Sequence, residues 1–270
     1  MSEPGQAKPS QFILETRNAG VATLVMNRPE RLNALNKYLA IALNESLGRL
    51  ATDKSIHAVV ITGAGRAFCA GGDLGVIGAG RENNDTTELE PLLRAGMHAV
   101  LKMRSMGQPV IAAVNGAAAG AGMNIALAAD IRIASEEAVF GENFVKVGLF
   151  PDYGGTYFLP QLVGAARAAE MFYTGEMIDA QTALRMGIVN RVVPGAQLEA
   201  EARGMAEKIA AAPCISIRAM KHALFGSRKL ELEKALDEEV QQQLKCFHSQ
   251  DCSEGIRAFM EKRPARFQGK

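Results

Sequence analysis

The feature that most constrains this chain is a strand-like run followed by a segment of very small residues, which occurs twice. Residues 58–62 (AVVIT) precede residues 68–74 (FCAGGDL), and residues 110–114 (VIAAV) precede residues 115–122 (NGAAAGAG). Small side chains let a ligand approach the backbone closely and leave amide N–H groups free to point at it. Two such amides, one from each segment, are what a site needs to hold a developing oxyanion.

The composition favours a globular α/β protein and limits its partners. The chain has 270 residues, of which 48% are hydrophobic, and a net charge of +1. This predicts one large domain, or a domain with a smaller appendage, and gives no bulk basic signal for nucleic acid. The four cysteines show no CxxC pair and no histidines at metal spacing, so we expect no metal site and reduced thiols in a cytoplasmic protein. No apolar signal-peptide region precedes residue 11.

The pattern of the first 195 residues alternates strands with helices. Residues 11–17 and 21–26 are predicted to form a hairpin, and residues 36–51 a helix with Leu39, Leu43, Leu47 and Leu50 on one face. Further strands are expected at 130–134, 138–140 and 189–193, and helices at 88–106, 120–129 and 165–173. Residues 110–129 are nearly apolar, but the Asn-Gly pair inside them favours strand, turn and helix over a membrane span.

Two stretches differ from this alternation. Residues 75–90 are rich in glycine and asparagine and are expected to be a mobile loop. From about residue 196 the pattern is helical throughout, with helices expected at 196–211, 214–225, 230–248 and 252–262. We therefore divide the chain into an α/β part, residues 1–195, and a helical part, residues 196–270, which serves for assembly or packs on its own core.

Six ordered segments resemble one family. They are residues 28–35 (RPERLNAL), 68–74, 113–122, 130–134 (DIRIA), 148–156 (GLFPDYGGT) and 254–263 (EGIRAFMEKR). Together they resemble the crotonase, or enoyl-CoA hydratase/isomerase, superfamily over essentially residues 11–269. The resemblance implies a ββα spiral with a helical C-terminal trimerisation region, often in hexamers. It also implies an acyl-CoA thioester as ligand, with coenzyme A as part of the substrate and no separate cofactor.

The resemblance assigns the oxyanion hole to the backbone N–H groups of Ala70 and Ala121. The second position is usually glycine in the family, and an amide donor survives the change if the backbone conformation suits a Cβ. Removing a proton beside a thioester carbonyl places negative charge on its oxygen, and one preorganised donor is typically worth roughly 3–4 kcal/mol to that enolate.

The two glutamates that handle water in family hydratases are absent. Their positions correspond to Asn124 and Phe144, neither of which is acidic. Asn124 cannot act as a base, and Phe144 would exclude the water that a hydratase must hold. Glu142 is near in sequence, and we interpret it as structural. The resemblance therefore argues against efficient classical hydration.

One carboxylate remains at a position that is catalytic in the family. Asp152 matches the catalytic aspartate of dienoyl-CoA isomerases, and the local sequence resembles the isomerases of bacterial phenylacetate degradation. A single base suits an isomerase, because it can take a proton from C2 and return it at C4. Phe144, Phe150 and Tyr153 are expected to desolvate Asp152 and raise its pKa. The alternative is that Asp152 only caps the following turn.

Further contacts to the substrate are implied by the same resemblance. Arg31 and Lys262 correspond to residues near phosphate or adenine groups, although either could be a solvated surface charge. The full set of expected substrate-binding residues is Arg31, Ala34, Phe68, Gly71, Gly72, Asp73, Leu74, Gly120, Asn124, Phe144, Tyr153, Phe259 and Lys262.

Three functions are carried forward from the sequence. The first is an isomerase that shifts a double bond, or rearranges a ring epoxide, in an enoyl-CoA, with Asp152 as acid and base. The second is a hydratase with relocated acid/base groups, and the third is a non-catalytic acyl-CoA-binding protein. We expect a cytoplasmic homotrimer or dimer of trimers without nucleic-acid or membrane partners. The acyl group is not readable from the sequence.

Overall fold

Parallel strands from the first two thirds of the chain form a six-stranded sheet. The computed structural model describes residues 11–225 and 229–268. The sheet has the order β1-β2-β3-β5-β7-β10, in which only β1 is antiparallel to its neighbour. Its strands are β1 (Ile13–Asn18), β2 (Val21–Met26), β3 (Ala58–Gly63), β5 (Val110–Val114), β7 (Ile131–Ser135) and β10 (Arg191–Val193). The predicted hairpin and the strands around residues 60, 112, 132 and 191 are confirmed.

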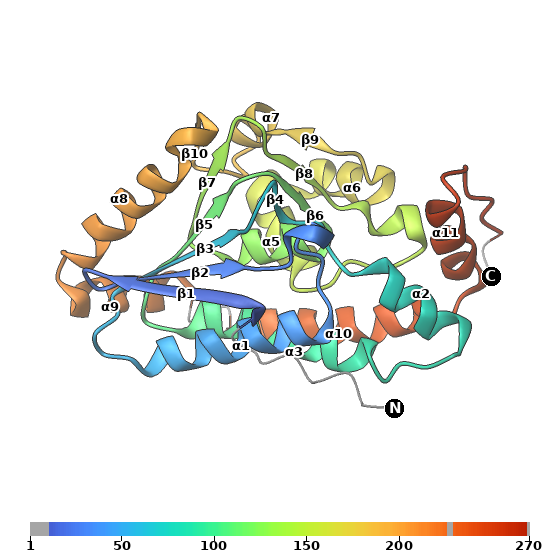
Figure 1. Cartoon of the computed structure of the whole chain (residues 1–270), viewed down its shortest axis with the longest axis horizontal. Helices are drawn as coiled ribbons and strands as arrows, with labels where there is room; N and C mark the ends of the chain where they lie inside the picture. Colours follow the sequence, from blue (N-terminus) through green and yellow to red (C-terminus); the bar gives the residue numbers. More distant parts are fainter. Residues whose placement is uncertain (1–10, 226–228, 269–270) are drawn as a thin grey trace.

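A second, four-stranded sheet runs beside the first, in the order β4-β6-β8-β9. Its strands are β4 (Ala67–Cys69), β6 (Ala117–Ala119), β8 (Val139–Gly141) and β9 (Ile178–Asp179). Each of β3, β5 and β7 in the large sheet is followed by one of β4, β6 and β8 in the small sheet, and then by helical structure (Figure 1). This repeated ββα unit confirms the predicted spiral fold.

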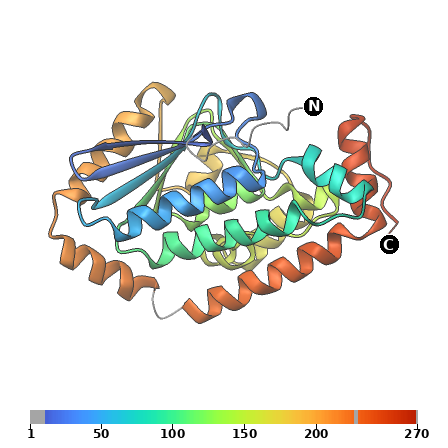
Figure 2. The same cartoon turned by 60° about the horizontal axis from the view of Figure 1, so that its bottom comes forward.

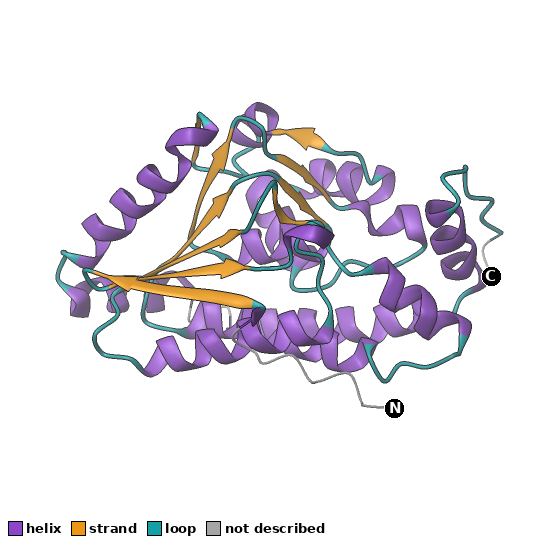
Figure 3. Cartoon of the chain, viewed as in Figure 1, coloured by secondary structure: helices purple, strands orange, loops and turns teal. Residues whose placement is uncertain are grey.

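Helices cover both faces of the large sheet. α1 (Lys37–Thr52) and α3 (Leu89–Ser105) lie together on one side, and α8 (Leu198–Ala210) lies on the other (Figures 1 and 3). The predicted leucine stripe of α1 is buried, because Leu39, Leu43, Leu47 and Leu50 are each at most 1% exposed. The outer face of the sheet packs its small and β-branched residues against Leu198, Ala202 and Ala206 of α8.

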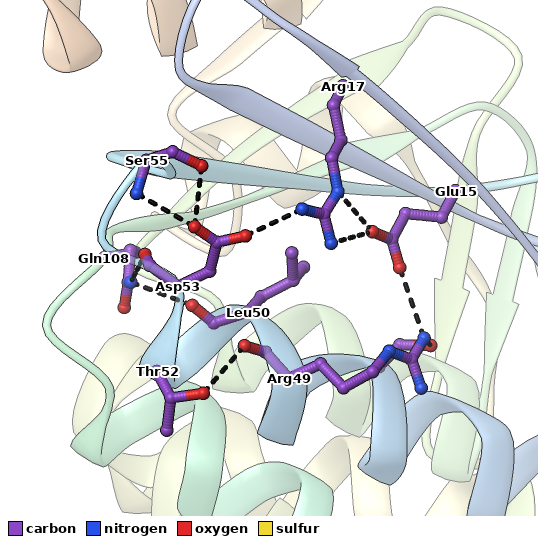
Figure 4. A network of polar contacts seen from close by, with 9 residues as sticks. Glu15, Arg17, Arg49, Leu50, Thr52, Asp53, Ser55 and Gln108 are labelled. Atoms are coloured by element: carbon purple, nitrogen blue, oxygen red, sulfur yellow. Dashed lines mark hydrogen bonds and ion pairs between the residues drawn. The ribbon is translucent and has the colours of Figure 1, made fainter.

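Polar side chains fasten the edge strand to the end of α1 (Figure 4). Arg17 of β1 bonds Glu15 and reaches Asp53, the residue after α1, with an Nη1 to Oδ2 distance of 2.7 Å. The buried amide of Gln108 donates to the carbonyl oxygens of Leu50 and Asp53 at 2.9 and 3.3 Å. Because the last carbonyls of a helix lack intrahelical partners, Gln108 satisfies groups that α1 leaves open.

Residues 75–90 do not form the expected loop throughout, since residues 74–82 are helical. Asp73 caps α2 (Leu74–Glu82) by accepting a hydrogen bond from the Gly75 amide at 3.2 Å. The glycines that suggested a loop instead allow close packing, because a Cβ added at Gly78 would lie 3.0 Å from Ile256. Small residues on a helix that packs tightly are easily mistaken for a flexible segment.

The remaining helices follow the small sheet and end the chain. They are α4 (Ala121–Ala128), α5 (Gly155–Val163), α6 (Ala165–Thr174), α7 (Ala180–Arg185), α9 (Cys214–Phe225), α10 (Lys229–Phe247) and α11 (Gln250–Met260). Short 3-10 turns within residues 11–225 include η2 (Pro29–Arg31), η3 (Asn143–Val147) and η4 (Gly195–Gln197). The helices predicted after residue 196 are confirmed. In the described part of the chain, no helix has both the length and the apolar character to cross a bilayer.

The C-terminal helices return to the α/β part of the same chain. α10 runs along α3 and packs against α5, and α11 stands at its end beside α2 (Figure 2). Helices on the two sides of residue 195 thus pack against each other, and the division of the chain into two parts there stays a prediction. Whether the helical part also serves for assembly stays a prediction.

Candidate active site

A cavity of about 130 Å³ lies where the two small-residue segments meet η3 and the turn before α5. Gly71 and Gly72 border it on one side and Gly120 and Ala121 on another. Much of the remaining wall is apolar, with Leu35, Ile77, Leu92, Phe144, Val147 and Leu149 among its lining residues. The two segments that the sequence singled out are thus brought together at one cavity.

In the first segment the available amide belongs to Gly72 and not to Ala70. The Ala70 N–H donates to the carbonyl oxygen of Leu32 at 3.0 Å, so the expectation for this amide is wrong. Leu35 pairs in parallel with the segment by binding the Gly71 carbonyl and the Asp73 amide, at 2.7 and 2.9 Å. That register leaves the Gly72 N–H without a hydrogen-bond partner among the described residues, and Gly72 lines the cavity.

In the second segment Ala121 is the first residue of α4. The amides of the first helical turn have no intrahelical acceptor, so the Ala121 N–H is available. Gly120 carries the unusual conformation, with φ of 51°, whereas Ala121 does not have positive φ and accepts its Cβ without strain. The segments approach closely, because a Cβ added at Gly71 would lie 3.9 Å from the Ala121 nitrogen.

Asp152 lines the same cavity and is 6% exposed. Its Oδ2 accepts a hydrogen bond from Gln243 Nε2 at 3.4 Å, and its Oδ1 has no partner among the described residues. Burial raises the pKa of this carboxyl well above its usual value, and the charge of Glu239 raises it further. The expected desolvation of Asp152 is therefore present.

The side chain of Asp152 does not cap the following helix. The N-cap of α5 is Gly154, which provides no side chain. The amides at this helix start, which have no intrahelical acceptor, are instead bound by Glu239 of α10, which accepts from the N–H groups of Gly154 and Thr156 at 2.7 and 3.0 Å. The alternative interpretation of Asp152 as a turn cap is wrong for its carboxylate.

Tyr153 and Phe144 both line the cavity, in agreement with their predicted positions. The backbone of Tyr153 is left-handed, with φ of 53°, and its hydroxyl donates to the Leu92 carbonyl oxygen at 2.8 Å. That bond holds the buried ring beside Asp152 and satisfies its polar atom.

Asn124 is fully buried and does not line the cavity. Its amide nitrogen donates to the backbone oxygen of Asp152 at 2.8 Å and approaches Glu142 Oε2 at 3.5 Å. Glu142 is also fully buried, and burial raises its pKa well above the usual value, followed in size by the charge of Asp152. Asn124 thus supports the backbone of the Asp152 turn, and Glu142 contacts Asn124 without lining the cavity.

Several other predicted contacts lie away from the cavity. Phe68 is completely buried in the core and does not reach the cavity. Asp73 pairs with Arg28 at 3.0 Å, and the carbonyl oxygen of Ala34 accepts from the same guanidinium. Two exposed residues, Arg31 and Lys262, also lie away from the cavity. The exposed Phe259 and the predicted contact Leu74 do border it.

Sequence reasoning missed Glu239 and Gln243, whose side chains are 1% and 2% exposed. They lie one helical turn apart on α10, on the buried stripe that also carries Leu232, Leu236 and Phe247. Polar residues at apolar positions of an amphipathic helix were the available signal, because such groups require buried partners.

Comparison with known proteins agrees with this arrangement. The sequence model of the family described as enoyl-CoA hydratase/isomerase matches residues 16–270. The chain is 43% identical over 256 residues to a probable enoyl-CoA hydratase of Rhodobacter capsulatus, covering 93% of this chain and 95% of that protein. It is 38% identical over 265 residues to the 1,2-epoxyphenylacetyl-CoA isomerase of Escherichia coli, covering 96% and 99%.

A solved structure gives the same result. The crystal structure of an enoyl-CoA hydratase from Mycobacterium avium subsp. paratuberculosis superposes with a TM-score of 0.86 at 31% identity, covering 95% of this chain and 98% of that one. The two-sheet spiral with its paired amides places the protein in the crotonase class of acyl-CoA enzymes. Within that class, the chain belongs to the enoyl-CoA hydratase/isomerase family.

Proposed function

We propose that this enzyme isomerises an enoyl-CoA thioester, shifting a double bond or rearranging a ring epoxide, with Asp152 as its single acid/base. The observation that supports this most is that Asp152 is the one carboxylate among the described residues that line the cavity. A reaction that moves one proton between two carbons needs one such group, whereas classical hydration in this family uses two.

The proposed chemistry starts with the thioester oxygen between the Gly72 and Ala121 amides. Asp152, in its ionised form, takes a proton from C2 of a 3-enoyl thioester. The C2–H electron pair delocalises into the carbonyl, and the two N–H groups stabilise the resulting enolate oxygen. The double bond then forms between C2 and C3 as Asp152 returns the proton to C4. A ring epoxide would use the same enolate stabilisation.

Phe144 and Asn124 support isomerisation over hydration. Phe144 lines the cavity at the position that corresponds to a hydratase glutamate, and its ring cannot act as an acid or base on a water. The side-chain amide of Asn124 donates a hydrogen bond to the Asp152 backbone oxygen, so it is not positioned as an acid or base. The 1,2-epoxyphenylacetyl-CoA isomerase among the relatives agrees with this preference.

Hydration is the second candidate function, favoured by the relative named a probable enoyl-CoA hydratase. It would require Asp152 to activate water unaided or with a group other than a second carboxylate of the cavity wall. A non-catalytic acyl-CoA-binding role is the third candidate, and the unpaired Oδ1 of a buried Asp152 argues against it.

The coenzyme A part is proposed to leave the cavity past Phe259, which is 58% exposed at its border. Lys146 also borders the cavity and is exposed, so it offers a cation for a phosphate there. Roles for the exposed Arg31 and Lys262 in phosphate binding, assembly as a trimer or hexamer and a cytoplasmic location remain part of this proposal.

The test compares 3-hexenoyl-CoA with crotonyl-CoA for the wild type and Asp152→Asn. We expect isomerisation without hydration, and a loss of at least about a hundredfold in Asp152→Asn, the lower range for a positioned acid/base. Asp237→Asn on the exposed side of α10 is the matched control and should leave turnover unchanged. Full turnover in Asp152→Asn would refute the assignment, and hydration without isomerisation would favour the second candidate.

A further inference from the structure

Two buried polar side chains of α10 hold the backbone on both sides of Asp152. Gln243 accepts a hydrogen bond from the Phe150 amide at 2.7 Å, two residues before Asp152. Glu239 accepts from the amides of Gly154 and Thr156, two and four residues after it. A helix from the C-terminal part of the chain thus fixes the turn that carries the proposed base.

The bond to Phe150 also orients the amide of Gln243. Because its Oε1 is the acceptor for an N–H, its Nε2 is the end that faces Asp152 Oδ2, at 3.4 Å. A donor to a carboxylate favours the charged form of that carboxylate. Gln243 therefore favours release of the Asp152 proton.

Glu239 acts in the opposite direction. Its carboxylate accepts from the Gly154 amide and from the amide and hydroxyl of Thr156, which favour its charged form against its burial. Burial nevertheless raises the pKa of Glu239 to about 7, so it is partly ionised at neutral pH. Its negative charge opposes ionisation of Asp152.

Three other titratable side chains near this pair are buried, and the exposed Lys146 borders the same cavity as Asp152. Glu142, from the β8 side, has a pKa well above its usual value because of burial first and Asp152 second, with Glu239 adding to the effect. Burial likewise raises the pKa of Tyr153 and brings that of Cys69 to about 12. Glu239 reaches the Asp152 turn directly through its hydrogen bonds to Gly154 and Thr156, and its pKa of about 7 lies close to neutral pH.

We propose that α10 supplies two positioning residues for Asp152: Gln243, which holds one carboxylate oxygen through its amide, and Glu239, whose negative charge opposes that of Asp152. This inference rests on the proposed isomerase function, in which Asp152 must both take and return a proton. A base of ordinary carboxyl strength takes a carbon-bound proton poorly, and proton transfer is most efficient when the catalytic group titrates near the working pH. Gln243 acts on the proton affinity of Asp152 from the cavity wall, and Glu239 acts on it from behind that wall.

The first experiment is the pH profile of kcat/KM for 3-hexenoyl-CoA. Because Asp152 must be ionised to accept a proton, kcat/KM should rise with pH as Asp152 loses its proton. Glu239→Gln removes the opposing charge and should move this rise to lower pH by at least about one unit, as expected for a close like charge. At acid pH the variant should therefore retain a larger fraction of its maximal kcat/KM than the wild type retains of its own.

Gln243→Glu should have the opposite effect, since it replaces a donor with a second carboxylate and moves the rise to higher pH. Gln243→Met, which removes the donor without adding charge, serves if Gln243→Glu does not fold. The matched controls are Glu238→Gln and Gln241→Glu, which make the same charge changes on the exposed side of α10. The controls should retain the wild-type profile.

A second readout needs no turnover. The infrared band of a protonated carboxyl that disappears in Asp152→Asn reports the titration of Asp152 directly. Its midpoint should fall in Glu239→Gln and rise in Gln243→Glu. Unmoved midpoints in both folded variants would overturn the inference and leave α10 a purely structural support. If the wild type shows no isomerisation, the proposed function fails, and the infrared midpoints still decide the role of α10.

Discussion

The ring of Tyr153 rests directly on the backbone of Gly96. A Cβ added at Gly96, in the buried side of α3, would lie 1.7 Å from Tyr153 Cζ and 2.0 Å from Cε1. No real Cβ tolerates such distances, so the ring occupies its position only because residue 96 lacks a side chain. The relationship links the packing of α3 to the residue next to the proposed base.

Gly96→Ala is therefore expected to displace Tyr153 and disturb Asp152. The forced repacking should lower the free energy of unfolding by about 1–3 kcal/mol. It should also lower kcat at temperatures where the protein is still folded. The measurement is urea unfolding together with turnover of 3-hexenoyl-CoA.

Gly48→Ala is the matched control for Gly96→Ala. It adds the same atom in the interior of α1, where the nearest heavy atom, in the Lys102 side chain, lies 3.5 Å away. This change should raise stability by about 0.5–1 kcal/mol, because alanine favours a helix over glycine. Equal effects of the two substitutions would contradict the packing argument.

Ala121→Pro tests the second oxyanion donor. Proline is tolerated at the first position of a helix, where its missing N–H has no intrahelical partner. The fold should survive, while kcat should fall about 10²–10³-fold, as for the loss of one oxyanion-hole donor. Ala121→Gly keeps the N–H and should remain active. Wild-type turnover in a folded Ala121→Pro variant would remove Ala121 from the oxyanion hole.

Lys221→Met tests the buried ion pair that ties α9 to the sheet. The ammonium group donates to the carbonyl oxygens of Met103 and Gln108 and to Asp130 Oδ2, at 2.7, 2.8 and 2.7 Å. Removing it leaves a buried carboxylate with less compensation, which should cost about 3–5 kcal/mol of unfolding free energy. Lys208→Met, at an exposed position of α8, should cost far less in the same denaturation measurement.

Glu142→Gln tests the pH dependence of stability. In the folded protein, burial raises the pKa of Glu142 well above its unfolded value, so the folded state binds this proton more tightly. The resulting stabilisation is fully present below the unfolded pKa and is lost as pH rises through the folded one. The wild type should therefore lose stability from about pH 5 upward, where an unfolded glutamate is ionised.

The Glu142→Gln variant should lose less unfolding free energy over the same pH range. The measurement is chemical denaturation at several pH values. Glu136→Gln, at an exposed position on the preceding turn, should keep the wild-type slope. A Glu142→Gln slope identical to that of the wild type would mean that Glu142 is ionised in the folded protein.

The sequence predicted the parts of the fold that depend on local pattern. The apolar run at residues 110–114 and the leucine stripe of α1 contain their own periodicity, and both elements form as expected. Asp152 and Ala121 were found through motifs, and the structure places both at one cavity. Local composition was misleading in α2, where glycines serve helix packing.

The rest depends on contacts between distant residues. The choice between the Ala70 and Gly72 amides is made by the pairing of Leu35 with the segment, a register that no local pattern reveals. The hydrogen bonds from Glu239 and Gln243 to the Asp152 turn join residues that are 83 to 93 positions apart in the sequence. Only their polarity on a buried helix face distinguishes them in the sequence.

The reach of α10 has a consequence for how the protein comes into being. The bond between Gln243 and Asp152 joins residues 91 positions apart, so it forms only after most of the chain has been made. Contacts of such long sequence separation close late, because they must overcome the entropy of the intervening chain. A growing polypeptide that already contains both small-residue segments would still lack the surroundings of its proposed base. Chemical competence is then a property of the finished fold, acquired when its last helices dock.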